Sequence, residues 1–234
     1  MNKSFLCIIL ARSGSKTIKD KNITQINGKP LIWYTIKEAI SSKVFEDIIV
    51  STDSKKYAKI CKNFGVSVPF LRPKYLSTGK SKAVDALKYT LRKFEKTNNK
   101  KYDFIMELMC TNPLKTAGDI QNVAKIQKKT NADSVIAVHR VEDGHPIRAK
   151  KIVNGKIRDF CMKETPETHR QDLKPNAYFR SGSIYSMTRK NLLKGIRYGT
   201  KDSIAYILPK HRVINIDEKL DLEFAKFLIE KNEN

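Results

Sequence analysis

The sequence predicts an α/β fold with a mostly parallel sheet and helices on both of its faces. Short, continuous apolar runs at residues 5–10, 47–52, 102–108 and 134–138 are typical of strands that are buried on both faces. Helical patterns separate these runs through the first 140 residues. Such an alternation of strand and helix is typical of parallel sheets that are built with right-handed crossovers.

Each helix of this first part carries a local signal. Pro30 suits the first turn of a helix over 30–40. The apolar residues between Ala83 and Phe94 recur at helical spacing. Thr116-Ala117-Gly118-Asp119 resembles a capping box with Asp in place of Glu or Gln, and it predicts the start of a third helix. Asp53 follows the second strand and is expected to cap the helix after it.

The alternation ends after Val138. Asn154-Gly155 sits between two alternating segments and predicts a β-hairpin over 147–160 with a type I′ turn. A polar stretch and a strand over 178–187 follow. We therefore divide the chain into an α/β core, residues 1–138 and 188–234, and an antiparallel insert, residues 139–187. Further strands are predicted at 204–208 and 213–216, and an amphipathic helix at 220–229.

Composition narrows the function. The 234 residues include 40% hydrophobic residues, enough for a substantial core, which excludes wholesale disorder. Lys and Arg exceed Asp and Glu by 46 to 24, a net charge of +22, so the partners are expected to be anions. No apolar stretch is long enough to span a bilayer, and no membrane is expected as a partner. Four cysteines without a CxxC pair fit reduced core residues of a cytoplasmic protein.

The loop over 11–22 follows the first strand, where an open α/β sheet places its ligands. It combines cationic side chains, hydroxyls and small residues that let backbone N–H groups approach a ligand, a combination suited to a triphosphate. It is not a Walker A loop, because Leu10 and Ser15 stand where that pattern needs glycines. A plain basic surface loop is the alternative interpretation.

Several segments, in the right order along nearly the whole chain, resemble the acylneuraminate cytidylyltransferases. They are Ala11-Arg12-Ser13-Gly14-Ser15-Lys16, Lys21-Asn22, Asn27-Gly28-Lys29-Pro30-Leu31-Ile32, Ser41-Ser42-Lys43, Ile48-Ile49-Val50-Ser51-Thr52-Asp53, Phe64-Gly65-Val66, Leu71-Arg72-Pro73, Thr111-Asn112-Pro113-Leu114-Lys115-Thr116, Arg170-Gln171-Asp172-Leu173, Gly182-Ser183-Ile184-Tyr185 and Ile216-Asp217 through Leu220-Asp221-Leu222. The resemblance implies a nucleotide-diphospho-sugar transferase-like fold. It also implies a cytidylyltransferase that couples CTP to a nonulosonic, sialic-acid-like sugar, giving a CMP-sugar and pyrophosphate.

The resemblance also implies roles for individual residues. Those expected to bind CTP are Arg12, Ser15, Lys16, Lys21, Asn22, Arg72 and Ser81. Arg12, Lys21 and Asp217 are expected to be catalytic, with Mg²⁺ as the cofactor. Asp217 matches a metal-binding aspartate, and Asn215 stands where the family usually has a second one, which removes a charge from the metal site. On the residues alone, Asp217 also fits a helix cap before Leu220.

The insert resembles the family's dimerisation element, which completes the sugar site of the partner subunit. A homodimer is therefore expected. The residues expected to bind the sugar are Arg170, Gln171, Arg180 and Tyr185, with Arg180 pairing with the sugar carboxylate. Tyr185 fits a packing role equally well. The departures at Glu107-Leu108-Met109-Cys110, Gly79, Ser181 and Asn215 leave the identity of the sugar acid open.

Three alternatives stay open. A cytidylyltransferase for another sugar acid, such as 3-deoxy-manno-octulosonate, is the nearest; Lys21-Asn22 argues against it, because that branch resembles Lys-Pro there. Asn215 also allows a catalytically weakened homologue that acts as a binding subunit. A nucleic-acid binder would explain the charge of +22, but the sequence shows no basic stripe with interleaved aromatics, so nucleic acid is not expected as a partner.

Overall fold

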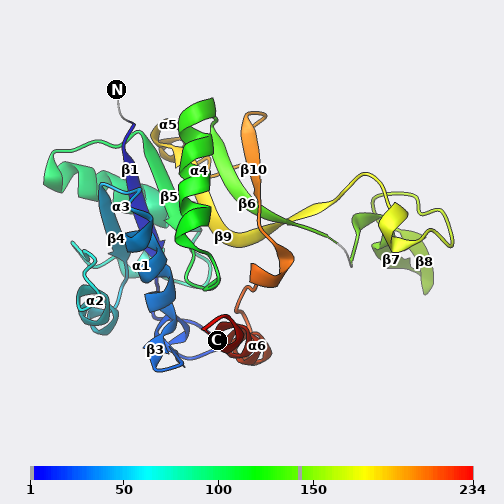
Figure 1. Ribbon diagram of the computed structural model, residues 1–234, viewed down its shortest axis with the longest axis horizontal. Coiled ribbons are helices and arrows are strands. Elements are labelled where there is room, and N and C mark those ends of the chain that lie inside the picture. The colour runs from blue at the N-terminus through cyan, green and yellow to red at the C-terminus, as the bar shows by residue number, and fades with distance from the viewer. Residues whose placement is uncertain (1–2, 142–143, 234) are drawn as a thin grey trace.

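The computed structural model describes residues 3–141 and 144–233. A six-stranded sheet runs through its centre in the order β10-β6-β9-β5-β1-β4 (Figure 1). Neighbouring strands pair in parallel except β9, which is antiparallel to both β5 and β6. The strands are β1 (Phe5–Leu10), β4 (Asp47–Ser51), β5 (Phe104–Leu108), β6 (Ser134–Arg140), β9 (Tyr178–Thr188) and β10 (Ser203–Ile207). The predicted mostly parallel α/β sheet is confirmed.

Helices cover both faces of this sheet because strands such as β1 are apolar on both sides. Phe5, Cys7 and Ile9 of β1 share a core cluster with residues of α1, α2 and α4. Leu6 and Ile8 pack on the opposite face with residues of α3 and α5. The helices are α1 (Leu31–Ser42), α2 (Lys55–Lys62), α3 (Ala83–Asn98), α4 (Ala117–Thr130), α5 (Arg189–Leu193) and α6 (Lys219–Glu233). A two-sided core of this kind is what the continuous apolar strands predict.

The starts of two helices test the predicted caps. Thr116 and Asp119 form the expected reciprocal capping box of α4. The cap of α2 is Ser54, whose side chain accepts a hydrogen bond from the backbone of Tyr57. The prediction that Asp53 caps this helix is therefore wrong. Asp53 instead points back to the loop after β1, where it has a role in the site described below.

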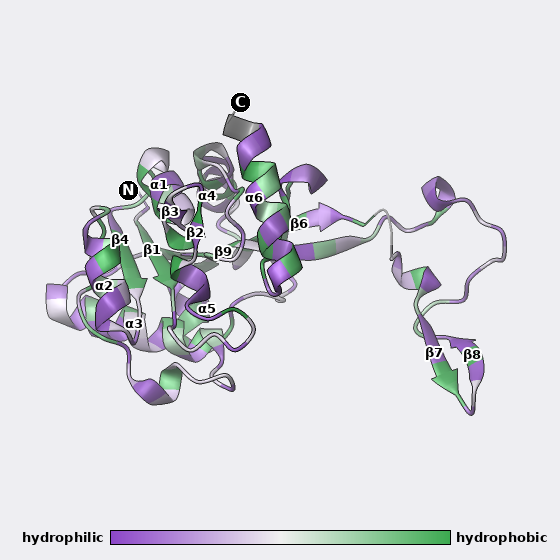
Figure 2. Ribbon diagram, turned by 90° about the horizontal axis from the view of Figure 1, so that it is seen from below, coloured by the Kyte–Doolittle hydropathy of each residue, from purple (hydrophilic) through white to green (hydrophobic). Residues whose placement is uncertain are grey.

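The segment between β6 and β9 extends away from the sheet as an arm (Figure 1). At its far end β7 (Lys150–Val153) and β8 (Lys156–Asp159) form the predicted hairpin. Asn154 and Gly155 both have positive φ, 49° and 73°, as a type I′ turn requires. Three large apolar side chains of the arm are mostly exposed: Ile152 at 78%, Ile157 at 68% and Phe160 at 63%. Figure 2 shows the apolar residues of β7 at the tip of the arm.

Two sequence predictions need correction here. The insert was predicted over 139–187, but β9 lies inside the main sheet between β5 and β6, where its residues Ile184, Tyr185 and Met187 are buried. The strand predicted over 213–216 does not form. Its alternating apolar residues instead pack against α6 from an extended loop. The strand was predicted because a loop that is buried on one side shows the same alternation of apolar residues as a strand.

The two short strands β2 (Gln25–Ile26) and β3 (Lys29–Pro30) pair with each other before α1.

Candidate functional site

A cavity of about 460 Å³ opens beyond the carboxyl end of β1. This is the edge where an open α/β sheet binds ligands. All seven residues expected to bind CTP line the cavity, together with Asp217 from the loop before α6. The described residues that line it are Leu10, Arg12, Ser15, Lys16, Thr17, Lys21, Asn22, Arg72, Leu76, Thr78, Gly79, Ser81, Lys82, Ala83, Ala86, Glu107, Met109, Cys110, Thr111 and Asp217.

The loop after β1 is fixed by polar contacts at both of its ends. Asp53, at the end of β4, accepts hydrogen bonds from the backbone N and the hydroxyl of Ser13, both at 2.9 Å. The buried amide of Asn22 donates to the backbone carbonyl of Arg12 at 3.1 Å. Asn22 therefore shapes the loop from within. The neighbouring parallel strand supplies Asp53 as a second support, which preorganises the loop for a ligand.

The cations of the loop face a second loop, residues 72–82. Nη1 of Arg12 donates to the backbone carbonyl of Thr78 at 2.5 Å. Gly79 lies so close to Lys16 that an added Cβ would be 3.4 Å from the Lys16 Cε atom. The loops thus hold Arg12 and Lys16 together at one wall of the cavity. Two neighbouring cations, such as Arg12 and Lys16 at this wall, suit the multiple charged oxygens of a polyphosphate.

Arg72 is buried beneath this wall, with only 4% of its surface exposed. Its Nε donates to the hydroxyl of Ser77 at 3.0 Å, and its backbone N donates to Thr52 at 2.7 Å. Burial lowers the pKa of Arg72, Asp53 opposes that shift, and Arg12 adds to it. The hydroxyl of Ser81 donates to the backbone carbonyl of Tyr75 at 2.7 Å. Both predicted residues therefore order the loop that closes the cavity.

Asp217 faces the cation-lined loop from the opposite side. Its Oδ1 accepts from Nζ of Lys21 at 3.0 Å, and its Oδ2 accepts from the side-chain amide of Asn215 at 2.6 Å. Its backbone carbonyl accepts from the hydroxyl of Thr17 at 2.6 Å. The amide nitrogen of Asn215 must face the carboxylate, because a carbonyl oxygen at that distance would be repelled. Both carboxylate oxygens and the backbone carbonyl of Asp217 thus accept a hydrogen bond from the residues around them, and the carboxylate does not cap α6.

The four residues expected to bind the sugar lie elsewhere. Arg170 and Gln171 are exposed on the arm, in the segment that Figure 1 shows extended away from the core. Arg180 stacks on the ring of Tyr198, with 4.5 Å between the guanidinium carbon and the ring centroid, and Tyr185 is 4% exposed. None of the four is among the described residues that line the cavity. One chain alone therefore does not gather these four residues with the CTP-binding residues.

Two charged residues of this region received no role from the sequence. Glu107 lines the cavity from the penultimate position of β5, and its place as the one acidic residue of that strand was the available signal. Lys115 is 1% exposed beneath the loop after β5. Its Nζ donates to the hydroxyl of Thr35 at 2.9 Å, to the backbone carbonyl of Met109 at 2.8 Å and to that of Asn112. Burial lowers its pKa to about 8.

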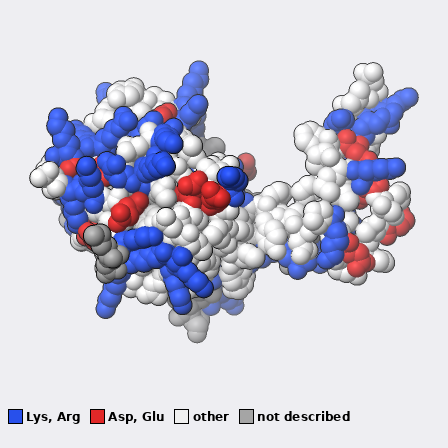
Figure 3. Space-filling model, turned by 90° about the horizontal axis from the view of Figure 1, so that it is seen from above, with Lys and Arg blue, Asp and Glu red and all other residues white. Residues whose placement is uncertain are grey.

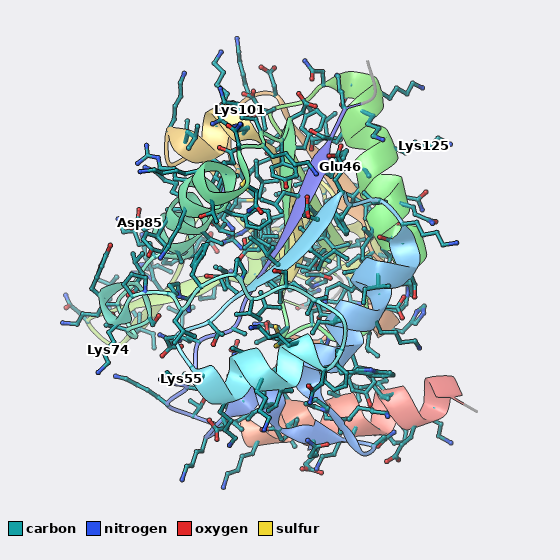
Figure 4. The ribbon with its side chains drawn as sticks, turned by 90° about the vertical axis from the view of Figure 1, so that its left-hand side faces the viewer. Glu46, Lys55, Lys74, Asp85, Lys101 and Lys125 are labelled. Atoms are coloured by element: carbon teal, nitrogen blue, oxygen red, sulfur yellow. The ribbon has the colours of Figure 1, made fainter. Side chains whose placement is uncertain are left out.

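The remaining positive charge is spread over the surface. Figure 3 shows Lys and Arg side chains across the visible face of the core and on the arm, with scattered acidic residues between them. The exposed lysines Lys55, Lys74, Lys101 and Lys125 point outward from separate elements (Figure 4). This distribution fits the expectation that the site itself uses only a few of the 46 cations. No helix among the described residues is long and apolar enough to cross a membrane.

The fold and the cation-lined cavity together are those of an α/β protein with a site suited to a nucleotide polyphosphate at the end of its first strand. A family model described as "Cytidylyltransferase" matches residues 6–223. The chain therefore belongs to the cytidylyltransferase family, and it is an enzyme of that class.

Curated relatives specify the family further. The chain is 31% identical to a pseudaminic acid cytidylyltransferase of Campylobacter jejuni, over 97% of each chain. It is 32% identical to a CMP-N,N'-diacetyllegionaminic acid synthase of Legionella pneumophila, again over 97% of each. It is 33% identical to an N-acylneuraminate cytidylyltransferase of Streptococcus agalactiae, over 92% of this chain and 51% of that protein. These relatives are CMP-nonulosonic acid synthases, in agreement with the predicted function.

The fold has a solved counterpart. A CMP:2-keto-3-deoxy-manno-octonic acid synthetase complexed with CTP matches with a TM-score of 0.73 over 98% of this chain and 100% of that one. The two sequences are 15% identical, so this likeness concerns the fold alone.

Proposed function

We propose that the chain couples CTP to a nonulosonic sugar acid, with Mg²⁺, and releases a CMP-sugar and pyrophosphate. The observation that carries the proposal is the cavity in which Arg12, Lys16 and Lys21 face Asp217. The cations suit a triphosphate, and a carboxylate opposite them suits a divalent cation that a triphosphate brings with it. The family and the names of its curated relatives support the choice of CTP and of a nonulosonic acid.

In this reaction the anomeric hydroxyl of the sugar attacks the α-phosphorus of CTP. One P–O bond forms, the bond to the pyrophosphate breaks, and the proton of the hydroxyl leaves to solvent or a base. We assign Arg12 and Lys21 to the phosphate oxygens, where their charge compensates that of the departing pyrophosphate. Lys16 and the backbone of the loop orient the triphosphate, while Arg72 and Ser81 shape the wall of the cytosine pocket. Alignment and charge compensation supply most of the catalysis in phosphoryl chemistry of this type.

The Mg²⁺ assignment rests on the carboxylate of Asp217 itself, since the two groups that contact this carboxylate, the Lys21 ammonium and the Asn215 amide nitrogen, are hydrogen-bond donors. The carboxylate of Asp217 is a hard oxygen ligand at the rim of the cavity, and Mg²⁺ combines one or two carboxylates with phosphate oxygens and water. We assign Asp217 to the metal. Asn215 orients that carboxylate through its amide nitrogen, or turns its carbonyl oxygen to the ion. When bound, Mg²⁺ would withdraw charge from the phosphate oxygens.

We further propose that two chains form a homodimer through their arms. Ile152, Ile157 and Phe160 expose large apolar surface near the tip of the arm, and an exposed apolar patch of this kind is typical of a protein interface. An arm that crosses to a second chain could bring Arg170 and Gln171 to the cavity of that chain.

We assign the reaction to the cytoplasm, because it consumes CTP and because the four cysteines are free thiols.

Calorimetric titration of the whole protein with CTP, UTP and ATP, each with Mg²⁺, tests the nucleotide assignment. We expect CTP to bind at least about tenfold more tightly than UTP or ATP, a difference of about 1.4 kcal/mol. Equal binding of the three nucleotides would contradict a cytosine-selective pocket.

A further inference from the structure

Glu107 places a negative charge in the wall of a cavity that we assign to anions. It lies on β5, directly between β1 and β9, and it is 2% exposed. The other four residues of this strand are buried as well, and none of them is charged. Burial raises the pKa of Glu107, and Arg197 opposes that shift. A carboxylate in such a position is costly unless a cation compensates it.

Arg197 supplies that cation from a loop that is not part of the cavity wall. Its Nε donates to Oε2 of Glu107 at 2.5 Å. Its guanidinium carbon lies 3.8 Å from the ring centroid of Tyr185, the residue of β9 that is paired directly with Glu107. Its Nη2 lies 3.6 Å from the sulfur of Met109, which also lines the cavity. Arg197 therefore packs against two residues that line the cavity, Glu107 and Met109, and against Tyr185 on the neighbouring strand.

The loop that carries Arg197 is itself held in place. Gly195 and Ile196 donate backbone hydrogen bonds to the last turn of α5, each at 2.9 Å. Arg189 of α5 forms two hydrogen bonds of 2.8 Å with the carboxylate of Glu95 on α3. The neighbouring Tyr198 is covered by Arg180. Arg197 is thus preorganised, since its backbone and its guanidinium plane are both fixed before any substrate binds.

We propose that Arg197 is a positioning residue for this enzyme, which cancels the charge of Glu107 and keeps that carboxylate turned away from the bound anions. The proposal rests on the function proposed above, because it requires anionic substrates. CTP and a sugar acid would both be repelled by an uncompensated carboxylate in the wall of a low-dielectric cavity. Without its partner, Glu107 would also be free to rotate toward the cations of the site and compete for them.

Three variants of the full-length protein test this role: Arg197→Met, Glu107→Gln and the double variant. We expect Arg197→Met to weaken CTP binding by about tenfold or more, which is about 1.4 kcal/mol, and to raise KM for the sugar acid with a smaller effect on kcat. The double variant should bind CTP within about threefold of the wild type, because both charges are then absent. Glu107→Gln alone should bind CTP as tightly as the wild type or more tightly, since it frees a positive charge.

Controls separate this role from a structural one. Lys100→Met removes a cation that pairs with Glu46 and Asp47 away from the cavity, and it should leave CTP binding unchanged. If Arg197→Met fails to fold, two other variants decide: Glu107→Gln and the charge-preserving Arg197→Lys. CTP binding that is near normal or tighter in both variants supports the proposal. Weakened CTP binding in either variant overturns it. A double variant as weak as Arg197→Met would overturn it, because Arg197 would then act on the substrate itself. Loss of kcat by about a hundredfold in Glu107→Gln would overturn it too, and would make Glu107 the proton acceptor.

The wild type in the same titrations distinguishes a failure of the proposed function from a failure of the role of Arg197. Absence of CTP binding by the wild type contradicts the proposed function. Normal CTP binding by the wild type together with unchanged binding by Arg197→Met contradicts only the role of Arg197.

Discussion

Lys21 and Asp217 lie 196 residues apart in the sequence and form an ion pair of 3.0 Å across the rim of the cavity. The side chain of Lys21 is only 13% exposed, while that of Asp217 is 64% exposed. The pair joins the loop after the first strand to the loop before the last helix. In the proposed reaction each partner meets a new group, because Lys21 pairs with phosphate and Asp217 with the metal. The pair therefore keeps both side chains in place until the nucleotide arrives.

The first prediction concerns Asp217. Asp217→Asn should lower kcat for pyrophosphate release by about a hundredfold and raise the Mg²⁺ concentration needed for half-maximal rate, because it removes a charged metal ligand. Glu223→Gln, on the exposed surface of α6, is the matched control and should behave as the wild type. An Asp217→Asn variant with unchanged Mg²⁺ dependence would remove Asp217 from the metal site.

A substitution of Asn215 is predicted to lower the Mg²⁺ requirement, whereas Asp217→Asn raises it. Asn215→Asp replaces the amide donor with a second carboxylate next to Asp217, and a divalent cation can bridge two carboxylates. The Mg²⁺ concentration for half-maximal rate should therefore fall several-fold. Asn215→Ala removes the hydrogen bond without adding charge and should not lower it. Equal Mg²⁺ dependence in both variants and the wild type would show that Asn215 has no influence on the metal.

Arg12 is predicted to bind the triphosphate directly. Arg12→Ala should raise the Kd for CTP by about tenfold to a hundredfold, since it removes a charge-assisted contact to phosphate and the bond to Thr78. Lys101→Ala, an exposed lysine outside the cavity, serves as the control for loss of one positive charge. If both variants lose the same affinity, the effect is due to net charge and not to the site.

The proposed dimer can be tested by mixing two inactive variants. Arg12→Ala damages the cavity, and Arg170→Ala damages the arm. If each arm serves the partner's cavity, a heterodimer of the two contains one site with both residues intact. We expect unfolding and refolding of the mixture to restore about a quarter of wild-type activity, because half of the dimers carry one intact site of two. No recovery, with light scattering that shows monomers, would contradict the arm-mediated dimer.

Lys115 links pH to stability. Its pKa is about 8 when folded and about 10.4 for an unperturbed lysine, so the unfolded chain binds more protons between these values. Stability must therefore rise with pH across this window. The difference in unfolding free energy between the wild type and Lys115→Met should increase by about 1–2 kcal/mol in favour of the wild type from about pH 7.5 to about pH 9.5. Urea unfolding at both pH values measures this difference, and a constant difference would contradict the lowered pKa of Lys115.

The sequence predicted most strands of the main sheet, and the residues that it marks for CTP line one cavity, because both depend on local patterns. Continuous apolar runs marked β1 and β5, and the single loop after β1 carried five of the seven residues expected to bind CTP, all of which line the cavity. The strand at 213–216 was mispredicted because an extended loop packed against α6 has the same alternation. The pairing of Glu107 with Arg197 could not be predicted, since it joins residues 90 positions apart. The contact of Asp53 with Ser13 depends in the same way on the pairing of β1 with β4.

The central claim is the coupling of CTP to a nonulosonic acid, and product formation tests it most directly. The protein should be incubated with CTP, Mg²⁺ and a panel of nonulosonic acids that includes pseudaminic, legionaminic and N-acetylneuraminic acid, with 3-deoxy-manno-octulosonate for comparison. We predict that at least one nonulosonic acid gives a CMP-sugar and pyrophosphate in equal amounts, and that chelation of Mg²⁺ abolishes both. Normal CTP binding without turnover of any nonulosonic acid, or turnover of 3-deoxy-manno-octulosonate alone, would contradict the account.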